Sequence, residues 1–364
     1  MTLIDLIASF DDDKTAIVDP DSDVRLTYGS LRNHASVLAS ALVDAGARRG
    51  DRIAIALPNG APLVTAVLAA STIGVAQPLR PNSEGRFDAS FENTRAHLVV
   101  DGDGIHVTVP SGGAAAETTM EVALIVESRG TTGRPRRVPL TYANLTIAAT
   151  RVVETLCLTP NDVSLCVMPV VHVHGLVTVT LATLASGGTV VIPRAFHPVT
   201  FWRVARDHGV TWYSATPALH QWVLARTADP GARRPAGAAR LRFIRSSGAT
   251  LPPPVRQTLE SAFGVPLVEG YEVTEASGEV ASSSTGTGKL RPLADLQVAV
   301  VDDFGRALSQ GATGEVALAG PTVARGYDND PEATGKFFVD GWFRTGDFGY
   351  LDADGCLTLA GEQG

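Results

Sequence analysis

The sequence predicts an α/β fold with two doubly wound, mostly parallel sheets and a small β-rich subdomain. Two observations predict this class. Apolar segments of strand length alternate with segments of helical periodicity through the first two-thirds of the chain, an order that favours parallel sheets. After about residue 277 the pattern changes to short β segments separated by turns. The 364 residues, 45% of them hydrophobic, suffice for two or three packed subdomains, which we place at 1–110, 111–276 and 277–364.

The individual elements follow from local patterns. In the first helix, apolar residues recur at helical spacing from Leu31 to Leu42, and Gly46 follows as a candidate C-cap. By the same reasoning, helices are expected over 28–45, 61–73, 176–185 and 200–208, and strands over 52–57, 98–101, 105–109, 165–168, 189–192, 212–215, 296–301, 314–319 and 356–360. Loops are expected over 228–239 and 282–288.

The composition excludes several classes of function. A net charge of −8 argues against a nucleic-acid partner, which would require a basic face. Three cysteines without a Cys-x-x-Cys or Cys/His cluster predict neither a disulfide framework nor a zinc site. The first residues lack the basic and apolar regions of a signal peptide, and the apolar helix candidate over 63–75 is too short to span a bilayer. We therefore expect a cytoplasmic protein without a membrane partner.

One loop rich in glycine and threonine is a candidate anion site. It reads Ser128-Arg129-Gly130-Thr131-Thr132-Gly133-Arg134-Pro135-Arg136-Arg137 and lies between two apolar segments. Glycine lets backbone N–H groups approach an anion, the threonine hydroxyls add donors, and the arginines supply charge for a polyphosphate. The common phosphate-loop pattern GxxxxGK[ST] does not align with this loop. On this pattern alone, an ordinary surface turn is the more frequent interpretation.

Three further motifs follow the loop in a fixed order. They read Thr141-Tyr142-Ala143-Asn144-Leu145, Glu269-Gly270-Tyr271-Glu272-Val273-Thr274-Glu275 and Trp342-Phe343-Arg344-Thr345-Gly346-Asp347. Together with the loop, they resemble the motifs of the adenylate-forming superfamily of acyl-CoA synthetases, luciferases and peptide-synthetase adenylation domains. The resemblance covers essentially the whole chain. It implies the fold of the large N-terminal domain of that superfamily, and the ATP-dependent activation of a carboxylic acid as an acyl-adenylate.

The resemblance also implies roles for individual residues. The Thr131-Thr132-Gly133 loop would hold the β- and γ-phosphates of ATP, Thr274 would contact the α-phosphate, and Glu275 would hold Mg²⁺. Tyr271 would lie against adenine, and Asp347 would accept hydrogen bonds from the ribose. The implied catalytic residues are Thr131, Arg136, Thr274 and Glu275; the implied cofactor-binding residues are Thr132, Gly133, Gly248, Ala249, Glu269, Gly270, Tyr271 and Asp347; and the implied substrate residues are His174, Glu272 and Val273. A small carboxylic acid is the implied substrate, with CoA or another thiol as acceptor.

Two histidines, His172 and His174, require separate interpretation. On an extended strand they would share one face, as metal ligands do. No further His, Cys or carboxylate is convincingly placed beside them, so we do not predict a metal site there. In the superfamily an aromatic or histidine residue near this position gates the acyl tunnel, and we assign that role to His174. The surrounding sequence, with Trp212-Tyr213-Ser214-Ala215, looks most like the branch that ligates small acids such as oxalate and malonate to CoA.

Several residues depart from the superfamily motifs. Arg136 stands where the superfamily has a lysine, Arg129 where it has a serine, and Arg137 where it has a glycine. Glu272 replaces a glycine beside the reacting carboxylate, which an ionised side chain would repel. We expect Glu272 to pair with an arginine such as Arg129, in preference to a cationic group on the substrate.

Two hypotheses about function remain open. The superfamily continues beyond a hinge with a small C-terminal domain that carries a catalytic lysine, whereas this sequence reads Gly361-Glu362-Gln363-Gly364 at its end. The resemblance therefore implies that this domain is absent, or that a separate domain or carrier protein is a partner. The first hypothesis is a ligase that activates a carboxylic acid. The second is a non-catalytic or repurposed relative that binds a nucleotide or acyl ligand. We favour the ligase because Thr274, Glu275 and Asp347 are retained.

Overall fold

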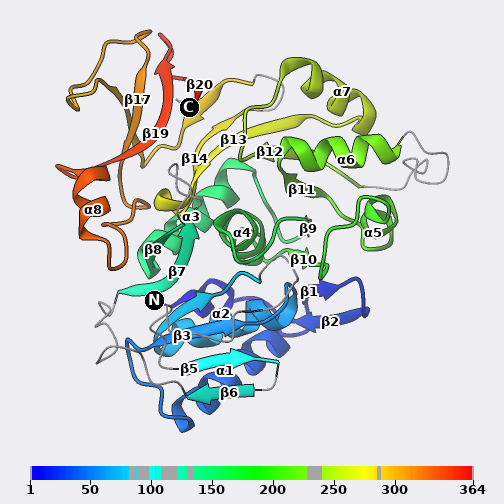
Figure 1. Cartoon of the computed structure of the whole chain (residues 1–364). Coiled ribbons are helices and arrows are strands. Elements are labelled where there is room, and N and C mark those ends of the chain that lie inside the picture. The colour runs from blue at the N-terminus through cyan, green and yellow to red at the C-terminus, as the bar shows by residue number, and fades with distance from the viewer. Residues whose placement is uncertain are drawn as a thin grey trace.

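Two sheets organise the chain, and helices pack against both (Figure 1). The computed structural model describes residues 2–81, 87, 98–102, 104–107, 121–128, 135–227, 240–284 and 288–362. The first strands of the smaller sheet, in blue and cyan, lie at one end of the molecule, and the larger sheet runs through most of the remainder (Figure 1). This arrangement confirms the predicted α/β class. Within the described residues, no helix is long and apolar enough to cross a bilayer.

The smaller sheet has a parallel centre and antiparallel edges. Its central strands pair in parallel, whereas the two edge strands pair antiparallel with their neighbours. The strand order is β6 (Gly104–Val107), β5 (Leu98–Asp101), β3 (Arg52–Ala56), β4 (Val75–Pro78), β7 (Val122–Ser128) and β8 (Arg136–Thr141). Two helices, α1 (Tyr28–Asp44) and α2 (Ala61–Ile73), pack against each other, and α2 is buried along most of its length because its sequence is apolar on every face.

The larger sheet has fourteen strands. Its order is β16 (Gln297–Val301), β17 (Gly314–Ala319), β19 (Trp342–Leu351), β20 (Leu357–Glu362), β15 (Leu290–Pro292), β14 (Gly278–Ser283), β13 (Leu267–Val273), β12 (Phe243–Ser247), β11 (Trp212–Ala215), β9 (Val163–Cys166), β10 (Thr189–Val191), β1 (Thr15–Asp19) and β2 (Val24–Thr27), with β18 (Phe338–Val339) beside β19. The strands from β13 to β1 are parallel, and those from β13 to β16 are antiparallel.

Helical segments connect the parallel strands, as crossover connections require. In chain order they are η3 (His174–Leu181), α4 (Ala182–Ala185), α5 (Phe201–Asp207), α6 (Pro217–Thr227) and α7 (Pro253–Phe263). α7 starts with proline and is followed by Gly264, whose φ of 64° favours glycine. The remaining helical segments are η1 (Leu3–Ile7), α3 (Tyr142–Thr155), η4 (Thr274–Ala276) and α8 (Pro331–Phe337).

Two apolar clusters form most of the described core. The first contains buried residues of α1, α2, α3 and η3 and of the strands that they cover. The second is rich in aromatic side chains, with Phe201, Trp202, Tyr213 and Phe263 in contact between β11, α5 and α7.

Most expected elements agree with the structure. The helix over 61–73 and the strands over 98–101, 212–215 and 314–319 match α2, β5, β11 and β17 to the residue. The helix expected from 176 begins earlier, at His174, and consists of the π-helix η3 followed directly by α4. The loop expected over 282–288 needs correction at its start, because Ser282 and Ser283 pair with β15. The loop expected over 228–239 lies outside the described residues.

Sheet membership does not follow chain order. β1 and β2 extend the larger sheet beside β10, whereas β7 and β8 extend the smaller sheet beside β4. The candidate phosphate loop thus leaves the end of β7 and returns at the start of β8, although residues 129–134 themselves lie outside the described residues. The subdomain boundaries at 110 and 276 stay predictions.

Candidate functional site

Two adjoining cavities lie where the parallel strands of both sheets end. The first has a volume of about 490 Å³ and is lined by residues at or just past the carboxyl ends of β7, β9, β11, β12 and β13. The second has a volume of about 450 Å³ and shares Gly248, Glu272 and Asp347 with the first. Both volumes are typical of small-molecule sites, and crevices at the carboxyl ends of strands are the usual binding positions in such folds.

Every predicted site residue that the structure describes lines one cavity or the other. The first cavity receives Arg136, His174, Val273, Thr274 and Glu275 together with the three shared residues. The second receives Ala249, Glu269, Gly270 and Tyr271. Thr131, Thr132 and Gly133 lie outside the described residues. The structure thus gathers segments that are far apart in the sequence, while the role of each residue stays a prediction.

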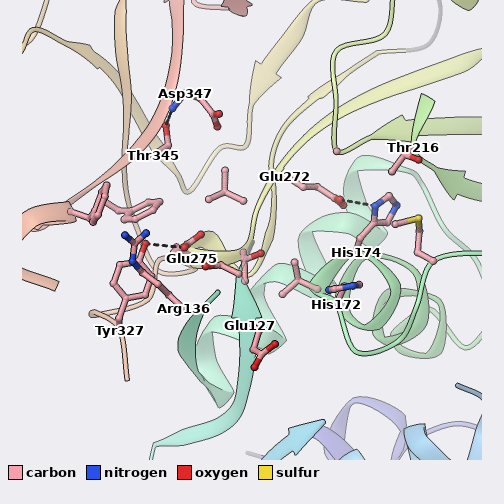
Figure 2. Close-up of a pocket in the computed structure, with 18 of the residues that line it drawn as sticks. Glu127, Arg136, His172, His174, Thr216, Glu272, Glu275, Tyr327, Thr345 and Asp347 are labelled. Atoms are coloured by element: carbon pink, nitrogen blue, oxygen red, sulfur yellow. Dashed lines mark hydrogen bonds and ion pairs between the residues drawn. The ribbon is translucent and has the colours of Figure 1, made fainter. Parts of the chain in front are cut away.

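Figure 2 shows that most labelled residues of the first cavity form two groups, while Glu127 belongs to neither. One group, which we call the arginine end, comprises Arg136, Glu275, Tyr327, Thr345 and Asp347. The other, which we call the histidine end, comprises His172, His174, Thr216 and Glu272. A single elongated ligand could therefore contact both groups.

Glu275 is the buried carboxylate of the arginine end. It lies on η4, directly after β13, and only 7% of it is exposed. Burial raises the pKa of Glu275, although the hydroxyl of Tyr327, which donates a hydrogen bond to its Oε1 over 2.9 Å, and the nearby Arg136 partly oppose this effect. The guanidinium of Arg136 lies over the rings of Tyr327 and Phe337, at 5.3 Å and 4.7 Å from their centres. A cation bound near Glu275 would offset the cost of burying its charge.

Asp347 lines both cavities and is hydrogen-bonded to Tyr271, which lines the second. The hydroxyl of Tyr271 donates a hydrogen bond of 2.5 Å to Oδ2 of Asp347. Asp347 lies in β19, where its backbone N–H donates to Oγ1 of Thr345 over 3.0 Å. Burial and the neighbouring Asp347 raise the pKa of Tyr271 well above its ordinary value, so the phenol stays protonated and holds the carboxylate in place.

The histidine end contains a network of polar side chains around Glu272. Oε1 of Glu272 accepts a hydrogen bond of 2.6 Å from Thr178 and lies 3.1 Å from Nη1 of Arg245. Oε2 lies 3.1 Å from Nδ1 of His174 (Figure 2). Burial alone would raise the pKa of Glu272, but His174 and Arg245 lower it to about 2. Glu272 is therefore ionised at neutral pH.

His174 is neutral and oriented by two hydrogen bonds. Burial lowers its pKa to about 4, with Glu272 opposing the effect and Arg245 adding to it. Its Nδ1–H donates to Glu272, and its Nε2 accepts a hydrogen bond of 2.7 Å from Ser214. Ser214 in turn accepts from Nη1 of Arg245 over 3.0 Å. The imidazole is thus fixed at the cavity wall as a positioned, uncharged group.

Arg245 is the main residue beside the cavity that the sequence reasoning missed. Its side chain is fully buried in β12 and also donates to Oε1 of Glu279 over 2.9 Å. The expected pairing of Glu272 with an arginine is therefore made by Arg245, whereas Arg129 lies outside the described residues. A signal was present in the sequence, because an arginine inside the apolar strand Phe243–Ser247 must find buried partners.

Arg137, another of the three arginines that depart from the motif, has a structural partner. Its Nε lies 3.2 Å from Oδ2 of Asp328, which also receives a hydrogen bond of 2.8 Å from Nη1 of Arg52 in β3. The backbone N–H of Asp328 donates to the carbonyl of Arg137 over 2.8 Å. These contacts attach the strand that follows the candidate phosphate loop to the segment before α8.

The residues fit a magnesium ion that is shared with a polyphosphate. Among the described residues, no group of three or more His, Cys, Asp or Glu side chains is placed to hold a metal. Mg²⁺ in nucleotide sites commonly takes only one or two protein carboxylates and completes its shell with phosphate oxygens and water. The buried, cavity-lining Glu275 provides such a carboxylate.

Comparison with known proteins identifies the family. The sequence pattern of the AMP-binding enzyme family matches residues 7–102 and 91–328. The chain is 32% identical over 383 residues to an oxalate–CoA ligase of Arabidopsis thaliana, covering 93% of this chain and 74% of the relative. It is 31% identical over 389 residues to a sulfoacetate–CoA ligase of Cupriavidus necator, covering 96% and 75%.

The fold agrees with solved structures of the same class. The N-terminal domain of FACL13 from Mycobacterium tuberculosis superposes with a TM-score of 0.85 at 25% identity, covering 99% of this chain and 98% of that domain. The fold and the two-ended cavity thus define the large domain of an adenylate-forming enzyme. The chain belongs to the AMP-binding enzyme family and is an AMP-forming ligase of the acid–CoA ligase type.

Proposed function

We propose that this chain uses ATP to convert a small carboxylic acid into an acyl-adenylate, which is then transferred to CoA or another thiol. The observation that supports this most strongly is that one cavity is lined both by residues implied for the nucleotide and by residues implied for the acid. The former are Arg136, Thr274, Glu275 and Asp347, and the latter include His174 and Glu272. In this reaction a carboxylate oxygen attacks the α-phosphorus of ATP. The bond from that phosphorus to the bridging oxygen breaks, and pyrophosphate leaves with the electron pair.

The proposed nucleotide residues act by positioning. Asp347 would accept hydrogen bonds from the ribose hydroxyls, and the Tyr271 hydroxyl keeps its carboxylate in one orientation. Gly248 follows β12 with a φ of 83°, so the chain turns there without a side chain and leaves space between the cavities. Thr274 would donate its hydroxyl to the α-phosphate. Positioning and charge neutralisation are the main requirements of such a displacement.

The residues of the arginine end would neutralise the negative charge of the phosphates. Glu275 would hold Mg²⁺, which supplies positive charge to the phosphates when bound. Arg136 is placed between the rings of Tyr327 and Phe337 and faces the same cavity, so its planar guanidinium can contact phosphate oxygens. The Thr131-Thr132-Gly133 loop would hold the outer phosphates, as the sequence predicts.

Relatives support the choice of acid and acceptor. The matched proteins are named for oxalate and sulfoacetate, which are small acids, and for CoA. A separate C-terminal domain or carrier protein would fit the same chemistry as a partner. The second candidate function is ligand binding without turnover, and it is favoured by the ionised Glu272 in the cavity wall.

Acid-dependent exchange of labelled pyrophosphate into ATP tests the proposal. We expect exchange with at least one acid from a panel of two- to six-carbon carboxylates. Glu275→Gln should reduce the exchange rate by about a hundredfold, because it removes the charge that would hold Mg²⁺. The matched control Glu332→Gln, on the exposed face of α8, should leave the rate unchanged. Nucleotide binding without any acid-dependent exchange would favour the second candidate.

A further inference from the structure

The carboxylate of Glu272 is one of two that share a single guanidinium. Glu272 in β13 and Glu279 in β14 are cross-strand partners. Arg245 donates to Oε1 of Glu279 over 2.9 Å and lies 3.1 Å from Oε1 of Glu272. Two carboxylates directly opposite each other would repel, so the guanidinium between them is what allows this pairing.

The guanidinium of Arg245 packs directly against the backbone of Gly270. A Cβ atom at Gly270 would lie 2.0 Å from Nη2 of Arg245, so the guanidinium fills the space that a side chain would take. Arg245 is fully buried, and both of its terminal nitrogens already donate hydrogen bonds. It is therefore not available to a ligand in the cavity, although Glu272 in front of it does line the wall.

The formal charges of this network disfavour the binding of an anionic group beside it. Two carboxylates surround one guanidinium, and Oε2 of Glu279 has no hydrogen-bond partner among the described residues. The remaining neighbours, His174, Ser214 and Thr178, are uncharged at neutral pH, because burial lowers the pKa of His174 to about 4. Of the four residues that define the histidine end, Glu272 alone carries a carboxylate.

We propose that Glu272, held by Arg245, makes the histidine end select acids with a single negative charge and reject acids with a second anionic group. This inference rests on the proposed function, since it concerns the tail of the acid that would be activated. Such selectivity would distinguish this chain from the relatives named for oxalate and sulfoacetate, because each of these two acids carries two acidic groups. A tail with a hydroxyl or amide would instead find hydrogen-bond partners in Glu272 and His174.

Matched pairs of acids test the charge selection. The full chain is loaded with Mg²⁺ and adenosine 5′-(α,β-methylene)triphosphate, in which the methylene bridge prevents loss of pyrophosphate. Calorimetric titrations then compare oxalate with oxamate, and malonate with malonamate, because each pair differs mainly by one negative charge. We expect the singly charged acid to bind about tenfold or more tightly than its diacid in at least one pair.

Three variants test whether Glu272 causes the preference for singly charged acids. Glu272→Gln keeps the shape and removes the charge, so the preference should fall to about threefold or less. In Glu272→Gly, Arg245 is uncovered and the diacids should bind more tightly than in the wild type. The matched control Glu279→Gln removes a carboxylate from the same guanidinium but does not line the cavity, so the preference should persist. Melting temperatures of all three variants report whether they fold.

The proposal is overturned if the wild type binds the diacids as tightly as the monoamides, or if the preference survives Glu272→Gln. It is also overturned if the nucleotide-loaded chain binds none of the singly charged acids. Failure of the chain to bind the nucleotide analogue would instead contradict the proposed function. The two failures are therefore distinguishable.

Discussion

Glu272 shows how a single substitution in a motif is accommodated by its surroundings. An ionised carboxylate inside a cavity wall is costly unless charged and hydrogen-bonded partners compensate for it. Arg245 supplies such a partner from β12, and His174 and Thr178 supply the others from η3. The sequence predicted that Glu272 needs an arginine, but it could not identify Arg245, because strand pairing rather than sequence distance brings the two together.

Gly270 offers a test of this accommodation. Gly270→Ala would place a methyl group against the Arg245 guanidinium and should lower the free energy of unfolding by about 2–4 kcal/mol. Gly335→Ala in α8 is a suitable control, because a Cβ there has no atom within 4 Å. Chemical denaturation measures both variants. Equal stability of Gly270→Ala and the wild type would show that Arg245 is not fixed in this position.

Buried histidines predict a pH dependence of stability. Burial lowers the pKa values of His174 and His220 to about 4, whereas an exposed histidine titrates near 6.5. The unfolded chain therefore binds these protons at a higher pH than the folded chain does. The contribution of each neutral histidine to the free energy of unfolding is fully present above pH 6.5 and should be lost as the pH falls toward 4. At pH 5 this loss should be on the order of 2 kcal/mol per histidine.

Urea unfolding at pH 7 and pH 5 measures this effect. His220→Asn should reduce the difference between the two pH values, whatever its effect on absolute stability. His220 is a suitable choice because it lies outside the cavities and contacts Tyr213 and the carbonyl of Arg245. A free energy of unfolding that does not change between pH 7 and pH 5 would contradict the neutral, buried state of these histidines.

At the scale of elements, η3 determines where the histidine end forms. The sequence predicted a helix from residue 176, and periodicity alone could not show that it starts as a π-helix at His174. The starting point depends on Gly175, where a Cβ would lie 2.4 Å from the carbonyl oxygen of Pro169. The start of η3 is therefore fixed by a tertiary contact, in which the backbone at Pro169 packs against Gly175.

Gly175→Ala should therefore displace the first turn of η3 and His174 with it. We expect acid binding to weaken by about tenfold or more, while nucleotide affinity changes by less than about threefold. Separate titrations with nucleotide and with acid, the latter on nucleotide-loaded protein, measure the two effects. An equal loss of both affinities would indicate general unfolding rather than a local shift.

At the scale of the whole molecule, contacts between distant segments place the two ends of the cavity. The alternation of strand-length and helical segments was enough to predict the α/β class, and the motifs named the described site residues that line the two cavities. It was not enough to predict that β1 and β2 join the larger sheet, or that β7 and β8 join the smaller one. These pairings depend on competition between many strand edges, which local periodicity does not report.

Asp328 connects these distant segments through Arg52 and Arg137. Arg52→Met should lower the free energy of unfolding by about 2 kcal/mol or more, because Arg52 is 2% exposed and its loss leaves a buried carboxylate with fewer partners. Arg306→Met, which breaks an exposed pair with Asp302, should cost less than about 1 kcal/mol. Comparable costs measured by chemical denaturation would show that the Asp328 contacts do not stabilise the fold.

Calorimetric titration of the full chain with Mg-ATP is the most direct test of the nucleotide site. We expect saturable binding to one site per chain and a rise in melting temperature with nucleotide concentration. Asp347→Asn should weaken binding by about tenfold, because it replaces an acceptor-only carboxylate, whereas Asp354→Asn in an exposed turn should not. The absence of binding heat and of a thermal shift at millimolar ATP would contradict the assignment of this cavity to ATP-dependent activation of an acid.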